Sequence, residues 1–494
     1  MRVRAFGLSC TLLIGSCYVA FAQSEQSQQL NDKVQQLEQE TRELKARIAA
    51  LEQTQTAPLP QAPQPKVMNT ILVEPVPGSP KPAQPSTSAS SGEQTILTVA
   101  QAESSSQTEQ KTEKKPTMDI YGFAQLDMGY DFGQNDPAWF DVMRPTKLPS
   151  FPNEFAGRDG VFYSGVRQTR FGVKNTFPTD YGDVKTIFEF ELFGVGVDAG
   201  QTTFRLRHAW GELGQFGAGQ TWSPFMDPDV FPNSLEYWGP NGMVFFRNVQ
   251  LRWQPINNGN KQLYFALERP GASADLGSIA DRVQLQGVRG RFPAPDLSAR
   301  LRWGGERSHV QIAGIGRYIA WDDVNRTALL DLSGHTWGWG VNASANLAFA
   351  KKDVIRLSVT YGHGIENYMN DAPVDVAPIV TGNPRVPIDG RPLPVFGMVA
   401  FLDHYWNERW SSTMGYSMLK IDNVPLQTAN SFHRGEYGLG NLLFYPAKNV
   451  MTGAEFQWGR RDNFADGFSY DDYRIQVSAR YNFDFKLGKP GGEK

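Results

Sequence analysis

The stretch Leu-Ser-Ala-Arg-Leu-Arg-Trp-Gly at residues 297–304 alternates apolar and polar side chains from end to end. In a β-strand successive side chains point to opposite faces, so Leu301 and Trp303 share one face, and Arg300 and Arg302 share the other. An apolar face backed by a charged face is typical of a strand that separates lipid from water. The stretch therefore predicts a membrane β-strand whose arginines face an aqueous lumen.

From residue 118 onward the chain repeats this texture in runs that nearly all end in turn residues. Tight turns and long loops alternate between the runs, as in outer-membrane barrels with periplasmic turns and extracellular loops. We therefore predict an all-β fold, a 16-stranded antiparallel transmembrane β-barrel, in preference to a soluble all-β protein. The run 281–291 also resembles a strand, but we assign it to a loop. The predicted strands are 118–130, 168–177, 183–193, 202–212, 214–221, 247–254, 261–268, 297–304, 308–320, 334–350, 353–363, 394–405, 408–420, 436–446, 449–460 and 472–485.

The composition argues against several classes of protein. No stretch of about 20 apolar residues follows the N-terminus, so no transmembrane helix is predicted. The net charge of -3 over 494 residues gives no reason to expect a nucleic-acid partner. The six histidines lie in no Gly-x-Ser-x-Gly motif and at no metal-ligand spacing. We therefore expect no metal, no cofactor and no enzyme, with a barrel hydrolase as the weaker alternative.

The first 22 residues have the pattern of a secretory signal peptide. Two arginines precede an apolar run, and Ala20-Phe21-Ala22 is a small-x-small cleavage site. The alternative is a lipoprotein signal, in which Ile14-Gly15-Ser16-Cys17 would leave Cys17 lipidated. Cys10 and Cys17 are the only cysteines, so cleavage after Ala22 predicts a mature chain without disulfides or thiol chemistry.

Residues 23–52 predict a short coiled coil that joins copies of the chain, an ordinary solvated helix being the alternative. Apolar residues recur at alternating spacings of four and three, and the flanking charges attract in a parallel, in-register assembly. The seam alone favours a dimer, whereas residues 47–52 resemble a known trimerisation motif, so we predict a homotrimer. The residues predicted to make the contact are Leu30, Val34, Leu37, Leu44, Arg47, Ile48, Leu51 and Glu52.

The remaining segments divide by composition. Residues 53–116 are rich in Pro, Ser, Thr and Gln without sustained periodicity, which predicts a linker. The barrel is assigned to residues 117–485 and a tail to residues 486–494. The run Tyr481-Asn482-Phe483-Asp484-Phe485 resembles the aromatic C-terminal signal of barrel proteins, which usually ends the chain.

Alternation along the predicted strands places a bank of basic side chains on the lumen face, because arginine facing lipid would cost about 2–4 kcal/mol near the midplane. Arginine presents a planar fork to carboxylate or phosphate, so the bank predicts a pore that prefers anions. The alternative is that Glu189 and Glu191 pair with the arginines and merely soften the wall. The same alternation places Trp210 in a lipid-facing girdle with His208 beside it. The predicted pore-wall residues are Arg170, Lys174, Arg205, Arg207, Arg252, Arg300 and Arg302.

The loop 222–246 follows the fifth predicted strand, where general porins fold a loop into the barrel as a constriction. Four prolines make it stiff, and it carries acids and rigid aromatic side chains. Acids on the loop opposite arginines on the wall would set up a transverse field across the opening. The alternative is an ordinary extracellular loop. The residues predicted to form the constriction are Asp227, Asp229, Glu236, Tyr237 and Trp238.

Three motifs carry a resemblance to a known family: Gly217-Ala218-Gly219-Gln220-Thr221-Trp222-Ser223, Asp229-Val230-Phe231-Pro232 and Tyr237-Trp238-Gly239-Pro240-Asn241-Gly242. With the order of signal, coiled coil, linker and barrel, they resemble the DcaP-like family of trimeric outer-membrane porins, across essentially the whole mature chain. The resemblance implies a homotrimeric channel for small anions, typically dicarboxylates. By face and position, it implies solute contacts at Arg170, Arg205, Arg207 and Arg252.

These inferences also set the expected location and partners. We expect the barrel in the outer membrane of a Gram-negative bacterium, in contact with lipid and lipopolysaccharide, and the coiled coil in the periplasm. The other expected partners are further copies of the chain and the transported anions. A structural alternative makes the coiled coil and linker a tether to peptidoglycan, with the barrel as its anchor; the lumen-facing arginines argue against a purely structural role.

Overall fold

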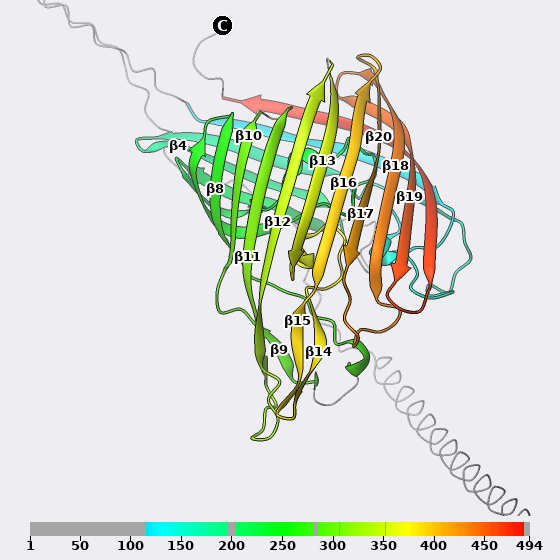
Figure 1. Ribbon diagram of the computed structural model, residues 1–494. Helices are drawn as coiled ribbons and strands as arrows, with labels where there is room; N and C mark the ends of the chain where they lie inside the picture. The colour runs from blue at the N-terminus through cyan, green and yellow to red at the C-terminus, as the bar shows by residue number, and fades with distance from the viewer. Residues whose placement is uncertain (1–114, 195–202, 281–284, 306, 351, 489–494) are drawn as a thin grey trace, which may run out of the picture. The chain divides into compact units, whose positions relative to one another are not determined.

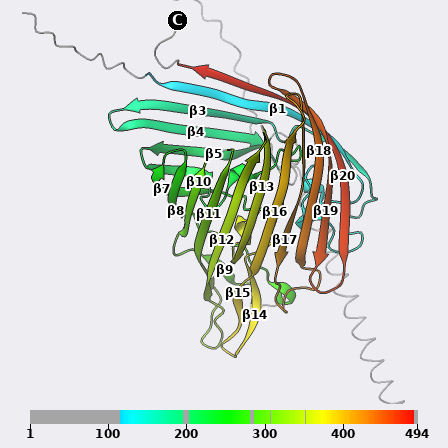
Figure 2. The ribbon, with the colours of Figure 1, turned by 45° about the horizontal axis from the view of Figure 1, so that its top comes forward.

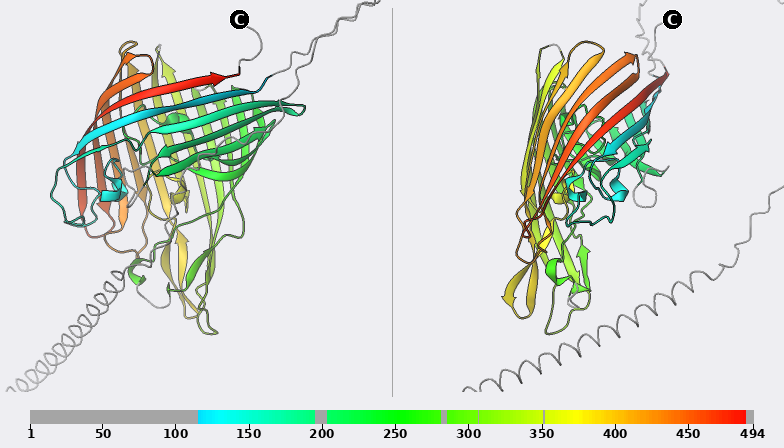
Figure 3. Two further views of the ribbon diagram at one scale, coloured as in Figure 1. Left: turned by 180° about the vertical axis from the view of Figure 1, so that it is seen from behind. Right: turned by 90° about the vertical axis from the view of Figure 1, so that its right-hand side faces the viewer.

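The computed structural model describes residues 115–194, 203–280, 285–305, 307–350 and 352–488. Across these residues sixteen antiparallel strands pair in succession and close into a barrel (Figure 1). β1 (Thr117–Asp131) closes it, because it pairs with β20 (Ser469–Leu487) on one edge and with β3 (Arg170–Thr179) on the other. These three strands lie side by side in Figures 2 and 3. The predicted antiparallel barrel is confirmed, while the predicted coiled coil lies outside the described residues.

The other barrel strands are β4 (Gly182–Leu192), β5 (Phe204–Leu213), β6 (Phe216–Trp222), β7 (Arg247–Asn257), β8 (Lys261–Glu268), β10 (Asp296–Gly304), β11 (His309–Asp323), β12 (Gly334–Phe349), β13 (Asp353–His363), β16 (Pro394–Tyr405), β17 (Trp410–Ile421), β18 (Phe432–Ala447) and β19 (Val450–Asn463). The shorter strands are β2 (Val161–Gly165), β9 (Val288–Arg291), β14 (Val376–Asn383) and β15 (Val386–Pro392). The described helical turns are η1 (Pro137–Trp139), η2 (Pro145–Lys147), η4 (Pro228–Val230), η5 (Gly277–Ile279) and η7 (Glu366–Tyr368). None of these helical turns has the length or apolar character needed to span a membrane.

The connections sort by length, with tight turns at one end of the barrel and long connections at the other. β9, β14 and β15 extend past the barrel at the long-connection end, which is extracellular in barrels of this kind (Figure 1). Assigning all of 281–291 to a loop was wrong for Val288–Arg291, because β9 pairs with Ala320–Asp323 and extends β11. β20 continues to Leu487, past the predicted end of the barrel at 485.

β5 departs from simple alternation near its middle. The pairing of β4 with β5 shifts between Glu189 and Phe190, which leaves Arg207 as the extra residue of a β-bulge. An extra residue reverses the faces that follow it, so His208 and Trp210 are buried on the lumen side. The prediction that both lie at the lipid interface is therefore wrong.

The hydrophobic core lies inside the barrel, on one side of the lumen. Apolar residues of the loop between β6 and β7 pack there against lumen-facing residues of β11 and β16–β18. The packing is close: a side chain on Gly397 of β16 would collide with the carbonyl of Gly242 in the loop. The main participants are Phe225, Met226, Val230, Met243, Val244, Ile315, Val399, Phe401, Leu419, Tyr437 and Leu439.

A second loop also folds inward. In the connection between β1 and β2, Met143 and Leu148 are fully buried in the same core. Arg461 of β19 donates to the Thr146 carbonyl at 3.1 Å, and Asn463 donates to the Ser150 carbonyl at 2.7 Å. The connection between β1 and β2 therefore adds to the apolar core that fills one side of the lumen.

Candidate functional site: an arginine wall facing a folded loop

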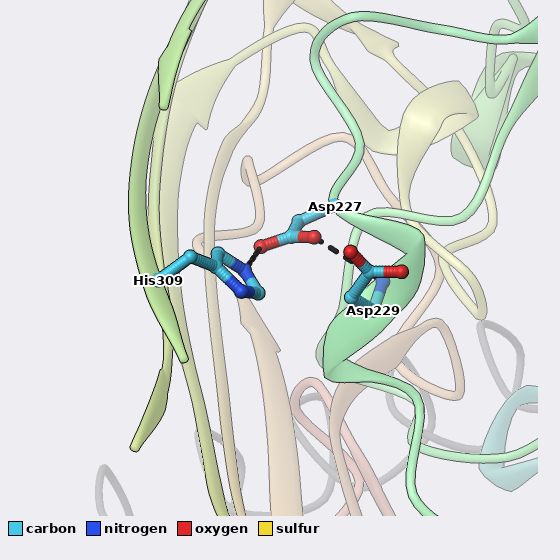
Figure 4. A group of neighbouring side chains, drawn as sticks. All are labelled: Asp227, Asp229 and His309. Atoms are coloured by element: carbon cyan, nitrogen blue, oxygen red, sulfur yellow. Dashed lines mark hydrogen bonds and ion pairs between the residues drawn. The ribbon is translucent and has the colours of Figure 1, made fainter. Parts of the chain in front are cut away.

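The loop 223–246 is anchored near its start by a charged cluster. Asp227 Oδ2 lies 2.7 Å from His309 Nε2 (Figure 4). The same oxygen accepts from Ser344 Oγ at 2.6 Å. Arg302 Nη2 lies 2.6 Å from Asp229 Oδ2. Burial raises the pKa of Asp227, but His309, Ser344 and Arg302 outweigh it and hold that pKa below its ordinary value. Asp227 is thus a charged latch between the loop and the wall.

The same cluster brings ligand atoms of Asp227, Asp229 and His309 within 4.8 Å of one another, a spacing that could hold a metal ion. Arg302 Nη2 lies 3.2 Å from His309 Nδ1, and since a guanidinium only donates, Nδ1 must accept. Nε2 then carries the proton and donates to Asp227, leaving no lone pair for a metal. The adjacent guanidinium charge also repels a cation. The residues present do not fit a metal ion.

A second anchor holds the middle of the loop. Glu236 Oε1 accepts from the backbone N–H groups of Trp238 at 2.9 Å and Met143 at 3.2 Å. Glu455 of β19 accepts from the N–H groups of Leu235 at 2.7 Å and Glu236 at 3.0 Å. Both carboxylates are about 1 % exposed, with no salt-bridge partner among the described residues. This segment is therefore held by hydrogen bonds to two buried acids.

This second anchor makes the loop sensitive to pH. Burial raises the pKa of Glu236 to about 8; hydrogen bonds from Gly239 and Trp238 oppose the rise, and Glu455 adds to it. Between its ordinary pKa of 4.5 and about 8, the folded loop holds a proton that the released segment would lose, so the anchor weakens as pH rises. We expect single-channel current noise to increase between about pH 5 and pH 9 in the wild type, but not in Glu236→Gln. Equal noise profiles in the two proteins would contradict this assignment.

Four arginines surround two glutamates on the part of the barrel wall that lies opposite the hydrophobic core. Arg207 Nε lies 2.5 Å from Glu189 Oε1, and its Nη1 lies 2.7 Å from Glu191 Oε2. Arg205 pairs with Glu191, whereas Arg170 Nη2 and Arg247 Nη2 lie 3.3 Å and 3.9 Å from its oxygens. Two carboxylates cannot neutralise four guanidinium groups, so the cluster keeps an excess of two positive charges.

Tyr237 joins the loop to this wall. Its hydroxyl donates to Glu191 Oε1 at 2.5 Å and accepts from Arg207 Nη1 at 2.8 Å and from Arg205. Its ring stacks on Phe193 with centroids 4.5 Å apart. Of the predicted constriction residues, Tyr237 is the one that contacts the arginines around Glu189 and Glu191, a cluster called the arginine wall below.

The other constriction residues lie elsewhere. Asp227 and Asp229 bind Arg302 and His309, and Glu236 faces β18 and β19, where Tyr437 donates to it. Trp238 meets Trp139 edge to face and donates to the Asn370 carbonyl at 2.9 Å. Asp227 and Asp229 thus do face one predicted wall arginine, Arg302. None of the three acids pairs with the four arginines around Glu189 and Glu191 in the described chain.

A cavity of about 290 Å³ separates the loop from the basic wall. Arg170, Arg207 and Arg480 line its wall side, and Trp222, Phe231 and Phe245 line its loop side. Arg480 Nε donates to Gln125 Oε1 at 2.5 Å and has no carboxylate within 4.0 Å in the described part of the chain. The cavity is thus basic on one side and largely apolar on the other.

The remaining predicted wall residues line other parts of the lumen. Lys174 lies with its Nζ 4.7 Å from the Tyr121 ring centroid, and Tyr121 donates to Glu189 at 2.7 Å. Arg252 and Arg300 lie nearer the short-turn end, both beside Tyr264. Arg302 is already paired with Asp227 and Asp229.

Sequence reasoning missed Arg247 and Arg480. Along β20, Ile475, Val477 and Tyr481 are exposed on the outer face, so the same alternation could have found Arg480 on the lumen face. Alternation misleads for Arg247, because it shares parity with outward Val249 but lies where the strand emerges from the loop and turns inward. The predicted oligomerisation residues lie outside the described residues.

The family model of the DcaP outer membrane protein matches residues 86–483. The chain belongs to the DcaP outer membrane protein family. The crystal structure of the outer membrane channel DcaP of Acinetobacter baumannii is similar in fold, with a TM-score of 0.61 and 20% identity over 75% of this chain and 98% of that one. Family and fold together support an outer-membrane channel.

More distant barrels are also similar to this DcaP-family chain. An anion-selective porin from Comamonas acidovorans has a TM-score of 0.45 and 10% identity over 75% of this chain and 100% of that one. In vitro folded OmpT of Vibrio cholerae has a TM-score of 0.44 and 12% identity over 74% of this chain and 98% of that one. No curated protein sequence compared with the chain matches it.

Proposed function

We propose that this DcaP-family channel conducts small anions, with dicarboxylates as its preferred solutes. The observation that carries the proposal is the excess of guanidinium groups over carboxylates in the cluster around Glu189 and Glu191, of which Arg170 and Arg207 line the cavity. The alternative, in which carboxylates pair with the wall arginines and weaken their charge, applies in part, because Glu189 and Glu191 do pair with them. Pairing leaves two charges over, however, and a fixed positive wall lowers the barrier for anions in a narrow pore.

The arrangement of the free cations supports a solute with two carboxylates. Arg480 lines the cavity and is bound only to the Gln125 amide, so it keeps donors for a ligand. Arginine forks bind carboxylates with two parallel hydrogen bonds. The apolar loop side, with Phe231 and Trp222, accepts the carbon skeleton between two such groups.

Ion selectivity tests the first part of the proposal. In planar bilayers under a KCl gradient, we expect a reversal potential with the sign of anion preference, because the wall is net positive. A cation-selective trace would overturn the proposed function. Liposome swelling with acetate, succinate and glutarate then tests the solute class, with faster entry expected for the dianions than for acetate.

We also propose that the chain assembles as a homotrimer through residues 23–52, which would lie in the periplasm. The support is the heptad pattern with attracting flanking charges, together with family membership. Native mass measurement in detergent should give three copies. Deleting residues 23–60 should slow assembly more than it changes conductance. A dimeric mass would instead favour the two-stranded coil that the seam composition alone suggests.

A further inference from the structure

Arg252 of β7 and Arg300 of β10 lie against one aromatic ring. They are nearer the short-turn end of the barrel than the cavity lined by Arg170, Arg207 and Arg480. Their guanidinium carbons lie 5.4 Å and 4.1 Å from the ring centroid of Tyr264 on β8. Arg252 is 9 % exposed, while Arg300 is partly exposed. Two cations thus share one ring, and one of them can be reached from the lumen.

Every hydrogen-bond acceptor bound to this pair is neutral. Arg252 Nε and Nη2 donate to Gln250 Oε1 at 3.0 Å and 2.9 Å, and Nη2 also donates to the Trp222 carbonyl. Arg300 Nη2 donates to Gln262 Oε1 at 2.6 Å. Its buried Nε has no hydrogen-bond partner, although the Tyr264 side chain lies beside it. Within the described ranges, no carboxylate lies within 4.0 Å of either guanidinium.

The nearest acids are already bound to other groups. Glu268 accepts from Ser223 Oγ at 2.7 Å and from Ser298, and Asp227 is held by His309 and Ser344. Glu212 accepts weakly from Trp210 and Gln254, each at 3.4 Å. None of these carboxylates forms a direct ion pair with Arg252 or Arg300 in the described chain.

Burying a charge is costly unless the charge is paired, and two like charges side by side repel. The Tyr264 ring offsets part of this cost by a cation–π contact, but it supplies no negative charge. The missing partner is thus an anion from the lumen. A carboxylate suits the site, because its two oxygens match the planar fork of a guanidinium.

We propose that Arg252, Tyr264 and Arg300 form a second anion-binding site that takes one carboxylate group of a solute in transit. The inference rests on the proposed anion channel and deepens it. Trp222 links the two sites: Arg247 of the arginine wall lies 4.7 Å over its ring, and Arg252 donates to its carbonyl. A dicarboxylate leaving the cavity can therefore place its leading carboxylate here before the trailing one is released.

The test is block of chloride current by succinate added on the short-turn side of single channels. In Arg300→Gln and in Arg252→Gln, we expect the half-blocking succinate concentration to rise by about fivefold, as for loss of a charge-assisted hydrogen bond. Arg300→Lys keeps the charge but loses the fork, so it should fall between the wild type and Arg300→Gln. Lys448→Gln is the matched control, since it removes an exposed positive charge from the turn between β18 and β19.

The outcomes separate the two proposals. A cation-selective wild type would overturn the channel's proposed anion function. An anion-selective wild type in which both glutamine variants block like Lys448→Gln would overturn the second site alone. Heat-modifiable gel mobility confirms that each variant barrel is folded, and either arginine variant suffices if the other fails to fold.

Discussion

Replacing Arg205 and Arg207 together with alanine should abolish most of the anion preference of the pore. The pair supplies two of the four guanidinium groups around Glu189 and Glu191, so the excess positive charge falls from two to none. A unit charge about 4 Å from a solute contributes roughly 1 kcal/mol even in water and more near protein. The anion-to-cation permeability ratio should therefore drop by roughly tenfold, measured as the reversal potential in a KCl gradient.

Two further variants make this result specific. Arg434→Gln with Arg460→Gln removes the same number of charges, but these residues pair with Asp462 on neighbouring strands and do not line the cavity. That double variant should keep the wild-type ratio. Glu189→Gln with Glu191→Gln raises the excess charge instead and should increase the anion preference. Equal ratios in all four proteins would show that the cluster does not face the conducting path.

Removing the loop should have the largest effect on conductance. Replacing residues 224–243 with a short Gly-Ser linker takes away the apolar mass that Phe225, Met226 and Met243 pack against the lumen wall. A sixteen-stranded barrel without a filling loop leaves a wide aqueous channel. Single-channel conductance should increase severalfold, and liposome swelling should admit sugars that the wild type excludes.

The barrel itself should survive the deletion, because its strand pairings close from β20 to β1 without the loop. The loss of buried apolar surface should nevertheless lower the unfolding temperature. Asp227→Ala provides a milder control, since it removes one latch and leaves the core packing in place. It should increase current noise with little change in mean conductance. Unchanged conductance after the full deletion would mean that the loop does not restrict the passage.

The sequence predicts the strands well because alternation is a local property. A residue facing lipid must be apolar wherever its strand lies, so Val249, Leu251 and Trp253 reveal their face without knowledge of their neighbours. The same rule placed Arg170 and Arg205 in the lumen. It failed at His208 and Trp210, where a single extra residue at Arg207 reversed the faces. No local pattern announces that bulge, because it is set by the pairing of two strands.

The candidate site was less accessible to prediction. That the loop 222–246 enters the barrel could be expected from its place after the fifth strand and its stiff composition. The partners of its acids could not, because Asp227 meets His309 and Glu236 meets Glu455 only after the barrel closes. Those contacts join residues far apart in the chain.

The sequence by itself determined the sixteen strands, the lumen-facing placement of arginines such as Arg170 and Arg205, and the position of the loop. These features follow from the local periodicity of side chains and from the cost of placing charge in lipid. Tertiary structure alone decided which arginines remain free. That depends on how many carboxylates come within reach of each guanidinium, a distance fixed by strand register and loop packing. Arg302 is neutralised by Asp229, whereas Arg300, two residues away on the same strand, has no carboxylate within 4.0 Å in the described chain.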